Sequence, residues 1–336
     1  MDRLTRRFLP YVMAATLLLV PDTPGPAAQS AQAPVTLRAV TAWTKAWPFN
    51  DMYFDWIKRV NERAGGRLKI EYLGGPEVYP AFEQLDPLKR RVMDTIITST
   101  GYVAGALPEV NATWLGFGAS PAELRAAGLV DLLDRITREK AGVTVLGLPL
   151  QVRFNVYLNK PIEKADLRGF KLRSVAVYDP VLKGLGASTV TLPPAEVLPA
   201  LQTGVVDGFG WPANFVVKPG FARVIKYKVV PNWWVGTDIV LMSAESFDAL
   251  PADLKKLLVD IMKEVERETP AYFLKLEKDE DAELAKAGVK IIELPAAEVE
   301  KVNRIQWEEG SKAFLLGPSP KYGAQLKELM ARFAPR

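Results

Sequence analysis

The sequence has 336 residues, with 43 Lys and Arg against 39 Asp and Glu, and it contains neither Cys nor His. The lack of Cys excludes disulfides, thiolate nucleophiles and iron–sulfur sites. The lack of His excludes a Ser-His-Asp triad, His-ligated zinc and an imidazole base, whereas carboxylate-pair catalysis and hard-metal sites remain open. Positive and negative charges are interspersed, which argues against a nucleic-acid-binding protein with its clustered basic face.

The first 33 residues have the pattern of a secretory signal peptide. Arginines within the first seven residues precede a mostly apolar run over 8–20, and Ala31-Gln32-Ala33 offers a small-residue cleavage site. The apolar run is too short to span a bilayer as a stable helix. Residues 5–9 partly match a twin-arginine export signal, and an ordinary signal peptide is the alternative. We therefore expect an exported mature chain of residues 34–336.

A strand, a helix and a second strand follow. Val35–Ala42 alternates and is rich in Val and Thr, which predicts a strand. A helix with one apolar face is predicted after Asn50 and stops at Gly65-Gly66, and Leu68–Tyr72 alternates as a second strand. Strand, helix and strand at this spacing predict a parallel pair in an α/β lobe.

The next part of the chain, from about residue 82 to residue 158, predicts two helices and three strands. Helices are predicted over Phe82–Met93 and Pro121–Lys140, and strands over Thr95–Thr98, Val143–Leu148 and Phe154–Leu158.

The segment 166–212 has the most informative pattern. Strands are predicted over Phe170–Val175, Ser188–Leu192 and Val205–Phe209, with short helices between them. Arg173 lies in the first of these strands among apolar residues, and Trp211 follows the third. Strand ends that bring a cation and an aromatic ring to one place indicate a ligand pocket.

The last third predicts a strand over Val224–Val230, a break at 231–234 and a strand over Ile239–Met242. A long helix is predicted from Leu250 to about Ala287, and Pro270 inside it should kink it. The remaining predicted elements are a strand over Val289–Leu294 and helices over Ala296–Phe314 and Tyr322–Phe333.

The central segment resembles the solute-binding proteins of TRAP (tripartite ATP-independent periplasmic) transporters, of the C4-dicarboxylate-binding (DctP-like) type. Four motifs of that family occur in the family's order, at Asp166–Arg173, Leu185–Ala187, Pro194–Val197 and Ala200–Gly208. The resemblance implies an α/β, two-lobed periplasmic solute-binding protein fold, with a ligand cleft between the lobes and a long kinked helix along both. We assign residues 34–151 plus about 239–280 to lobe 1, and residues 152–238 plus about 281–336 to lobe 2.

Two arginines are predicted to bind the ligand. The resemblance implies that Arg173 binds a carboxylate, which its planar guanidinium can hold through two parallel hydrogen bonds. The alternative is a structural ion pair with Asp166, Asp179 or Glu196. Many family members have an arginine at the relative position of Arg153 that helps to hold the ligand, and the alternative there is a solvated charge at a strand end.

Trp211 and Asn214 lie just beyond a predicted strand end, where a ring can stack on a ligand, although a tryptophan packed beneath the hinge is the alternative. Some family members carry, immediately before this Trp, an acidic residue that helps to bind a metal. This chain has Gly210 there, so we expect no metal. We also expect no cofactor. Gly208 and Gly210 are predicted to leave room for a larger ligand.

Trp43, Tyr102 and Trp234 belong to a set of aromatic residues in or near predicted loops. Exposed aromatic side chains are costly unless they are covered, so part of this set should line the site, although any single one is more readily explained as core. As a set they favour an apolar or aromatic organic acid over a sugar acid.

The sequence therefore predicts a periplasmic receptor, not an enzyme, that binds an organic acid anion and delivers it to TRAP membrane permease subunits. We expect a monomer and no nucleic-acid partner. The alternatives are a ligand-binding module that feeds a sensor, a secreted carboxylate-pair hydrolase, and a receptor for an ABC importer, which fits the motif order poorly.

Overall fold

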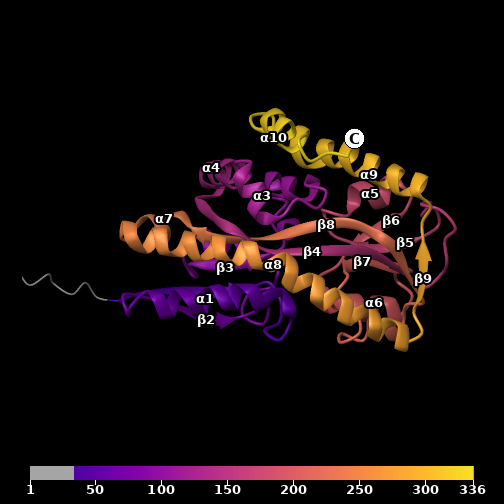
Figure 1. The fold of residues 1–336 in the computed structure, drawn as a ribbon, viewed down its shortest axis with the longest axis horizontal. Helices are drawn as coiled ribbons and strands as arrows, with labels where there is room; N and C mark the ends of the chain where they lie inside the picture. The colour runs from indigo at the N-terminus through magenta and orange to yellow at the C-terminus, as the bar shows by residue number, and fades with distance from the viewer. Residues whose placement is uncertain (1–33, 336) are drawn as a thin grey trace, which may run out of the picture. The chain divides into compact units, whose positions relative to one another are not determined.

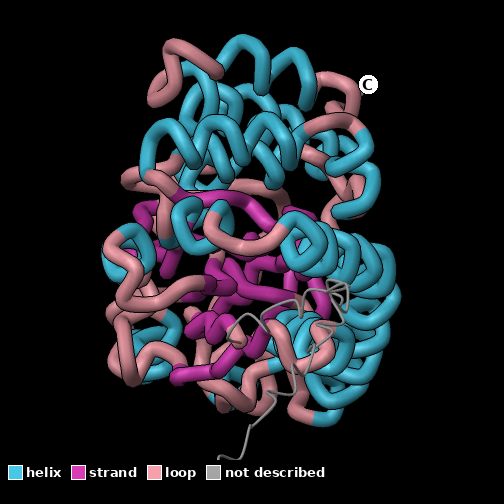
Figure 2. The backbone as a smooth tube through the Cα atoms, turned by 90° about the vertical axis from the view of Figure 1, so that its left-hand side faces the viewer, coloured by secondary structure: helices cyan, strands magenta, loops and turns pink. Residues whose placement is uncertain are grey.

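The computed structural model describes residues 34–335, so the predicted signal peptide lies outside the described residues. One nine-stranded sheet runs through this part of the chain in the order β2-β1-β3-β8-β4-β7-β5-β6, with β9 paired to β8. Helices flank the sheet, whose strands occupy the interior (Figures 1 and 2). Within residues 34–335 no helix is both long and apolar enough to cross a membrane.

The first three elements form the predicted parallel unit. β1 (Val35–Thr41) and β2 (Leu68–Gly74) are parallel, and α1 (Asp51–Arg63) connects them. Helix α1 buries one face and ends before Gly65 and Gly66, whose φ angles of 58° and 77° favour glycine. β3 (Thr95–Thr98) pairs in parallel with the other edge of β1.

Two long antiparallel strands, β4 (Val143–Leu158) and β8 (Tyr227–Ser243), form the centre of the sheet. The prediction of separate short strands in both regions is wrong. Pro231 does not end β8. In the pairing of β8 with β4, the register shifts between Val229 and Trp234. Pro231 lies in this irregular stretch, where the sheet requires no hydrogen bond from a backbone N–H. The predicted lobe boundaries, after 151 and before 239, fall inside these two strands.

The central segment forms the far half of the sheet. β5 (Lys171–Ser174) is parallel to β6 (Ser188–Thr191) and to β7 (Gly208–Pro212), and β7 is antiparallel to β4. Between these strands lie α5 (Asp179–Gly184), η4 (Pro194–Glu196) and α6 (Val197–Gln202). β7 begins three residues later than predicted, so Trp211 lies within the strand.

Several helices are shorter than predicted. The region 121–140 forms two helices, α3 (Pro121–Ala126) and α4 (Leu129–Ala141), because Gly128 adopts a φ of 88° between them. Only Leu85–Lys89 (α2) is α-helical in the region 82–93. The remaining elements are η1 (Pro48–Asn50), η2 (Thr100–Tyr102), η3 (Pro108–Leu115), η5 (Phe221–Arg223), α7 (Ala244–Asp248), β9 (Lys290–Glu293), α9 (Ala296–Gly310), the π-helical η6 (Ser311–Leu316) and α10 (Gly323–Met330).

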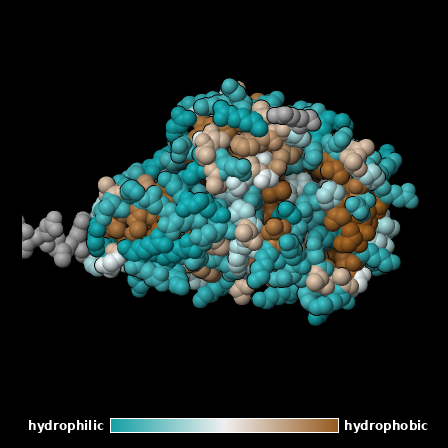
Figure 3. Space-filling model, viewed as in Figure 1, coloured by the Kyte–Doolittle hydropathy of each residue, from teal (hydrophilic) through white to brown (hydrophobic). Residues whose placement is uncertain are grey.

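The long helix α8 (Ala252–Lys286) is continuous through Pro270, as predicted, and it changes direction along its length (Figure 1). It packs on β4 and α1, and its outer surface is mostly hydrophilic (Figure 3). The buried Glu266 fixes it to the sheet, accepting hydrogen bonds from the Arg125 guanidinium at 2.6 Å and from the Leu148 amide at 2.8 Å.

Candidate functional site

Arg173 is buried on β5, with 1% of the residue exposed. Its Nε and Nη2 atoms donate hydrogen bonds to the Leu192 carbonyl at 3.0 and 2.9 Å, and Nη1 donates to the Gly210 carbonyl at 3.4 Å. Within residues 34–335 no carboxylate lies within ion-pair distance of this guanidinium. A buried charge is costly unless an opposite charge compensates it. The arrangement therefore favours an anion supplied from outside the chain.

The structural ion pair that the sequence left open is not formed. Asp166 pairs with Arg168 at 2.5 Å, and Asp179 pairs with Lys183 at 2.8 Å. Glu196 lies exposed in η4.

Arg173 lines a small cavity together with Trp43, Tyr102, Trp211 and Asp238. The walls come from β4, β5, β7, β8 and the segments that contain η1 and η2. The other lining residues are apolar, aromatic or hydroxyl-bearing: Phe49, Ser99, Leu150, Phe154, Val175, Tyr178 and Pro212. The free volume of about 20 Å³ is close to that needed for one water molecule. An organic acid can therefore enter only if these walls move apart.

Three of the predicted aromatic contacts lie in this cavity. The ring centre of Trp211 is 5.2 Å from the Arg173 guanidinium carbon, and its indole N–H donates to the Phe215 carbonyl at 2.6 Å. The ring centres of Trp43 and Tyr102 lie 6.2 Å apart. Burial raises the pKa of Tyr102, and the nearby Arg173 opposes this rise, so the phenol is neutral at ordinary pH. These rings offer flat apolar surface beside a cation.

Asp238 was missed by the sequence reasoning. It lies on β8 opposite Leu150 of β4, and 5% of the residue is exposed. Burial raises its pKa to about 8, and a hydrogen bond with Ser99 opposes the rise. The sequence could have identified it, because Asp238 is the single charged residue in the mostly apolar segment Val235–Met242.

The space beside the two glycines of β7 is filled, so the prediction that they admit a larger ligand is wrong. A Cβ at Gly210 would lie 2.8 Å from the Tyr178 ring, and one at Gly208 would lie 2.2 Å from the Tyr157 carbonyl oxygen. Glycine is required here for close packing inside the protein.

Arg153 and Asn214 line a second cavity, of about 260 Å³, beside Pro270 of α8. The Arg153 side chain is half exposed, and it lies 3.7 Å from the Glu277 carboxylate. Asn214 is buried, and neither its amide nitrogen nor its amide oxygen has a protein partner. These two predicted contacts therefore line a different cavity from Arg173.

Trp234 is buried and does not line the Arg173 cavity. Its ring centre lies 4.9 Å from the ring centre of Tyr178, which does line that cavity, so Trp234 contacts a wall residue without lining the cavity itself.

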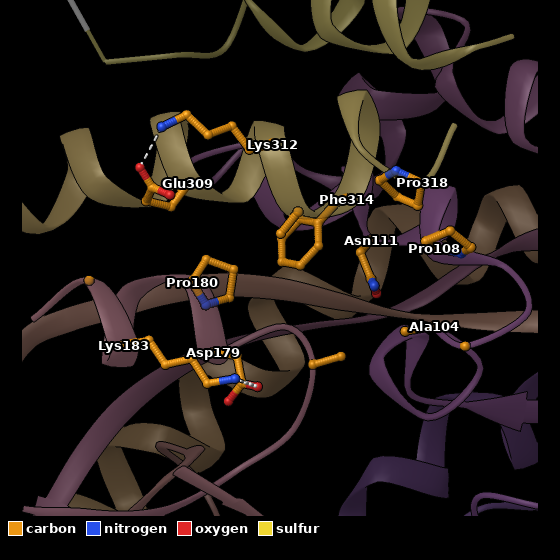
Figure 4. Close-up of a pocket in the computed structure, with 14 residues that line it drawn as sticks. Ala104, Pro108, Asn111, Asp179, Pro180, Lys183, Glu309, Lys312, Phe314 and Pro318 are labelled. Atoms are coloured by element: carbon orange, nitrogen blue, oxygen red, sulfur yellow. Dashed lines mark hydrogen bonds and ion pairs between the residues drawn. The ribbon is translucent and has the colours of Figure 1, made fainter. Parts of the chain in front are cut away.

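A larger groove, of about 900 Å³, lies between η3, α5 and the α9–η6 segment (Figure 4). Its two lysines are already neutralised, Lys183 by Asp179 at 2.8 Å and Lys312 by Glu309 at 2.7 Å. Figure 4 shows Phe314 and Pro180 facing the groove from opposite sides. By volume alone, this groove would be the candidate binding site. We prefer the smaller cavity because the Arg173 guanidinium there has no counter-ion among the described residues.

A cavity among the strands of an α/β sheet, with a buried cation and aromatic rings around it, is typical of a solute receptor. The family model described as bacterial extracellular solute-binding protein, family 7 (DctP) matches residues 41–312, and the chain belongs to this family. The predicted fold class and the predicted TRAP solute-binding family are both confirmed.

Individual relatives agree with this assignment. The chain is 27% identical over 233 residues to a monocarboxylate 2-oxoacid-binding periplasmic protein of Nostoc, covering 66% of this chain and 64% of the relative. A TRAP periplasmic solute-binding protein from Desulfovibrio salexigens with bound orotic acid has a TM-score of 0.79 at 24% identity, covering 89% of this chain and 99% of that one. One from Pseudoalteromonas atlantica with bound sodium and pyruvate has a TM-score of 0.79 at 22% identity, covering 90% and 94%. The two structural likenesses establish the two-lobed fold.

Proposed function

We propose that this protein is the extracytoplasmic receptor of a TRAP transporter and that it binds an organic acid anion through a pair between Arg173 and the ligand's carboxylate. The observation that carries the proposal is the buried guanidinium of Arg173, which has no counter-ion within residues 34–335 and faces a cavity lined by aromatic rings. A bidentate carboxylate would supply the missing negative charge with matched hydrogen bonds.

Trp211, Trp43 and Tyr102 would cover the apolar part of the ligand. The similar proteins named above bind orotic acid, pyruvate and 2-oxoacids, so the ligand class fits a small organic acid. The free volume of about 20 Å³ requires the lobes to separate for loading and to close on the ligand. We place the hinge on β4 and β8, where the two lobe boundaries fall. We further propose that the protein lies in the periplasm, acts as a monomer and delivers the acid to membrane permease subunits.

The carboxylate-pair hydrolase fits this cavity less well. Glycoside hydrolysis requires two carboxyl groups on opposite sides of the reacting bond. Among the described residues that line the cavity, Asp238 is the single carboxyl group.

The test is thermal unfolding of the purified protein with a panel of 2-oxo acids, dicarboxylates, aromatic acids and sugar acids, repeated with Arg173→Ala. An acid at a hundred times its dissociation constant should stabilise the protein by about 2.7 kcal/mol. We expect one acid class to raise the melting temperature of the wild type and not that of the variant. If the rise persists in Arg173→Ala, the arginine–carboxylate pair is rejected. If no acid stabilises the wild type, the organic-acid receptor is rejected.

A further inference from the structure

The Arg173 cavity holds one carboxyl group and one guanidinium that do not pair. Asp238 enters from β8 and Arg173 from β5, and both side chains line the cavity. No ion pair joins them within 4.0 Å, although both residues are at least nine-tenths buried. The guanidinium donors face the carbonyls of Leu192 and Gly210 instead. The carboxyl group therefore does not act as the counter-ion of the arginine.

The other groups around Asp238 leave it without a charged partner. η2 contributes Tyr102, and the residue preceding α5 contributes Tyr178. Burial raises the pKa of both phenols, so both are neutral at ordinary pH. The remaining walls contribute no titratable group among the described residues: Leu150 and Phe154 from β4, Trp211 and Pro212 from β7, Val175 after β5, and Trp43, Phe49 and Ser99 from the loops.

Charge balance decides which form of Asp238 fits the proposed function. With a neutral Asp238, the cation of Arg173 and the anion of the ligand cancel. With an ionised Asp238, the ligand carboxylate would add an uncompensated negative charge to a buried site, which is costly.

We propose, resting on the receptor function above, that Asp238 is the second ligand-binding group and acts in its protonated form, donating its O–H to another oxygen of the acid held by Arg173. The ligand class is then a monoanionic organic acid with a second acceptor oxygen, such as a 2-oxo acid or a 2-hydroxy acid. Burial, which raises the pKa of Asp238 to about 8 against the opposing hydrogen bond with Ser99, supports this form at neutral pH.

The proposal makes binding proton-linked. At neutral pH the carboxyl group already holds its proton and the affinity is constant. At higher pH the free protein loses that proton, and each binding event must take one from solvent. The affinity should then fall up to tenfold for each further pH unit, which is the dependence expected for uptake of a single proton.

The test is isothermal titration of the full protein with pyruvate and orotate at pH 6 to 9.5, in pairs of buffers with different ionisation enthalpies. For at least one of these acids we expect constant affinity up to about pH 7.5, and uptake approaching one proton per acid bound at pH 9. Asp238→Asn keeps a donor, so at pH 6 it should bind that acid within about tenfold of wild type. Its affinity should not change with pH and it should take up no proton. Asp131→Asn, at an exposed position on α4, should keep the wild-type pH dependence.

Two results would overturn the proposal. One is wild-type binding that is independent of pH across this range. The other is binding that requires calcium after treatment with a chelator, or sodium after dialysis into sodium-free buffer, and that loses this requirement in Asp238→Asn, since the carboxylate would then act ionised beside a metal ion. The melting temperature of Asp238→Asn without ligand shows that the variant is folded. If none of the acids binds to wild type at pH 6, the receptor proposal itself fails for these acids, which is a different outcome from pH-independent binding.

Discussion

The guanidinium of Arg173 lies 5.2 Å from the ring centre of Trp211, and the two side chains come from the neighbouring parallel strands β5 and β7. The ring face attracts the cation, and the carbonyls of Leu192 and Gly210 accept its hydrogen bonds. These contacts orient Arg173 without neutralising it. A side chain that is fixed in place but left charged is suited to capturing an anion.

The first prediction concerns the stability of the ligand-free protein. We expect Arg173→Met to abolish stabilisation by organic acids and to lower the melting temperature only slightly, because removal of a buried charge without a counter-ion offsets the loss of its hydrogen bonds to the Leu192 and Gly210 carbonyls. Scanning fluorimetry with and without acid measures both effects.

Arg125→Met is the matched control, because Arg125 pairs with the buried Glu266 at 2.6 Å. Removing one partner of a buried pair costs about 3–5 kcal/mol, so this control should melt clearly below wild type. A similar loss of stability in Arg173→Met would show that Arg173 is a structural residue.

The second prediction separates the two arginines. Arg153 lines the cavity beside Pro270, apart from Arg173, and its side chain is half exposed. We expect Arg153→Ala to change the affinity for an organic acid by less than about threefold, since exposed ion pairs contribute about 0–1 kcal/mol. Arg173→Ala should abolish measurable binding under the same conditions. Equal losses of affinity in the two variants, measured by titration calorimetry, would instead place both arginines on the ligand.

The third prediction tests the close packing at β7. Gly210→Ala places a methyl group 2.8 Å from the Tyr178 ring, which lines the Arg173 cavity. We expect a loss of stability of about 1–3 kcal/mol together with weaker binding, because overpacking displaces the ring. Gly105→Ala, where no atom lies within 4 Å of the added carbon, should be close to neutral. Denaturant unfolding measures the stability of both variants, and equal stabilities would show that Tyr178 moves freely.

The sequence was sufficient for the motif that carries Arg173 and for the local unit β1–α1–β2, because both depend on short-range patterns. Arg173 could be found because it is a charge inside an apolar strand with ordered flanking motifs. The parallel pairing of β1 and β2 followed from the spacing of two strands around one helix.

Long-range features were less accessible. Pro231 suggested the end of a strand, yet β8 continues because the proline lies where the register of the pairing with β4 shifts. Local sequence propensity does not show where the pairing with a distant strand is irregular. Asp238 was overlooked because its significance depends on which strand lies opposite and on which cavity it enters. The separation of Arg153 from Arg173 likewise depends on the path of β4 across the sheet.

The last prediction concerns stability as a function of pH without ligand. The pKa of Asp238 in the folded protein is about 8, above the value near 4 of an unfolded chain. The folded state therefore binds the extra proton between these values. The contribution of Asp238 to stability is present in full below about pH 4 and is lost as the pH rises to about 8.

Asp238→Asn does not titrate and has nearly the same shape. We therefore expect its melting temperature to be close to wild type at pH 4, to rise relative to wild type up to pH 8, and to hold a constant advantage above that. Asp131→Asn should show no such trend. A difference that instead grew toward low pH would mean that Asp238 is ionised in the folded protein and held by a positive charge, which contradicts the absence of an ion pair with Arg173.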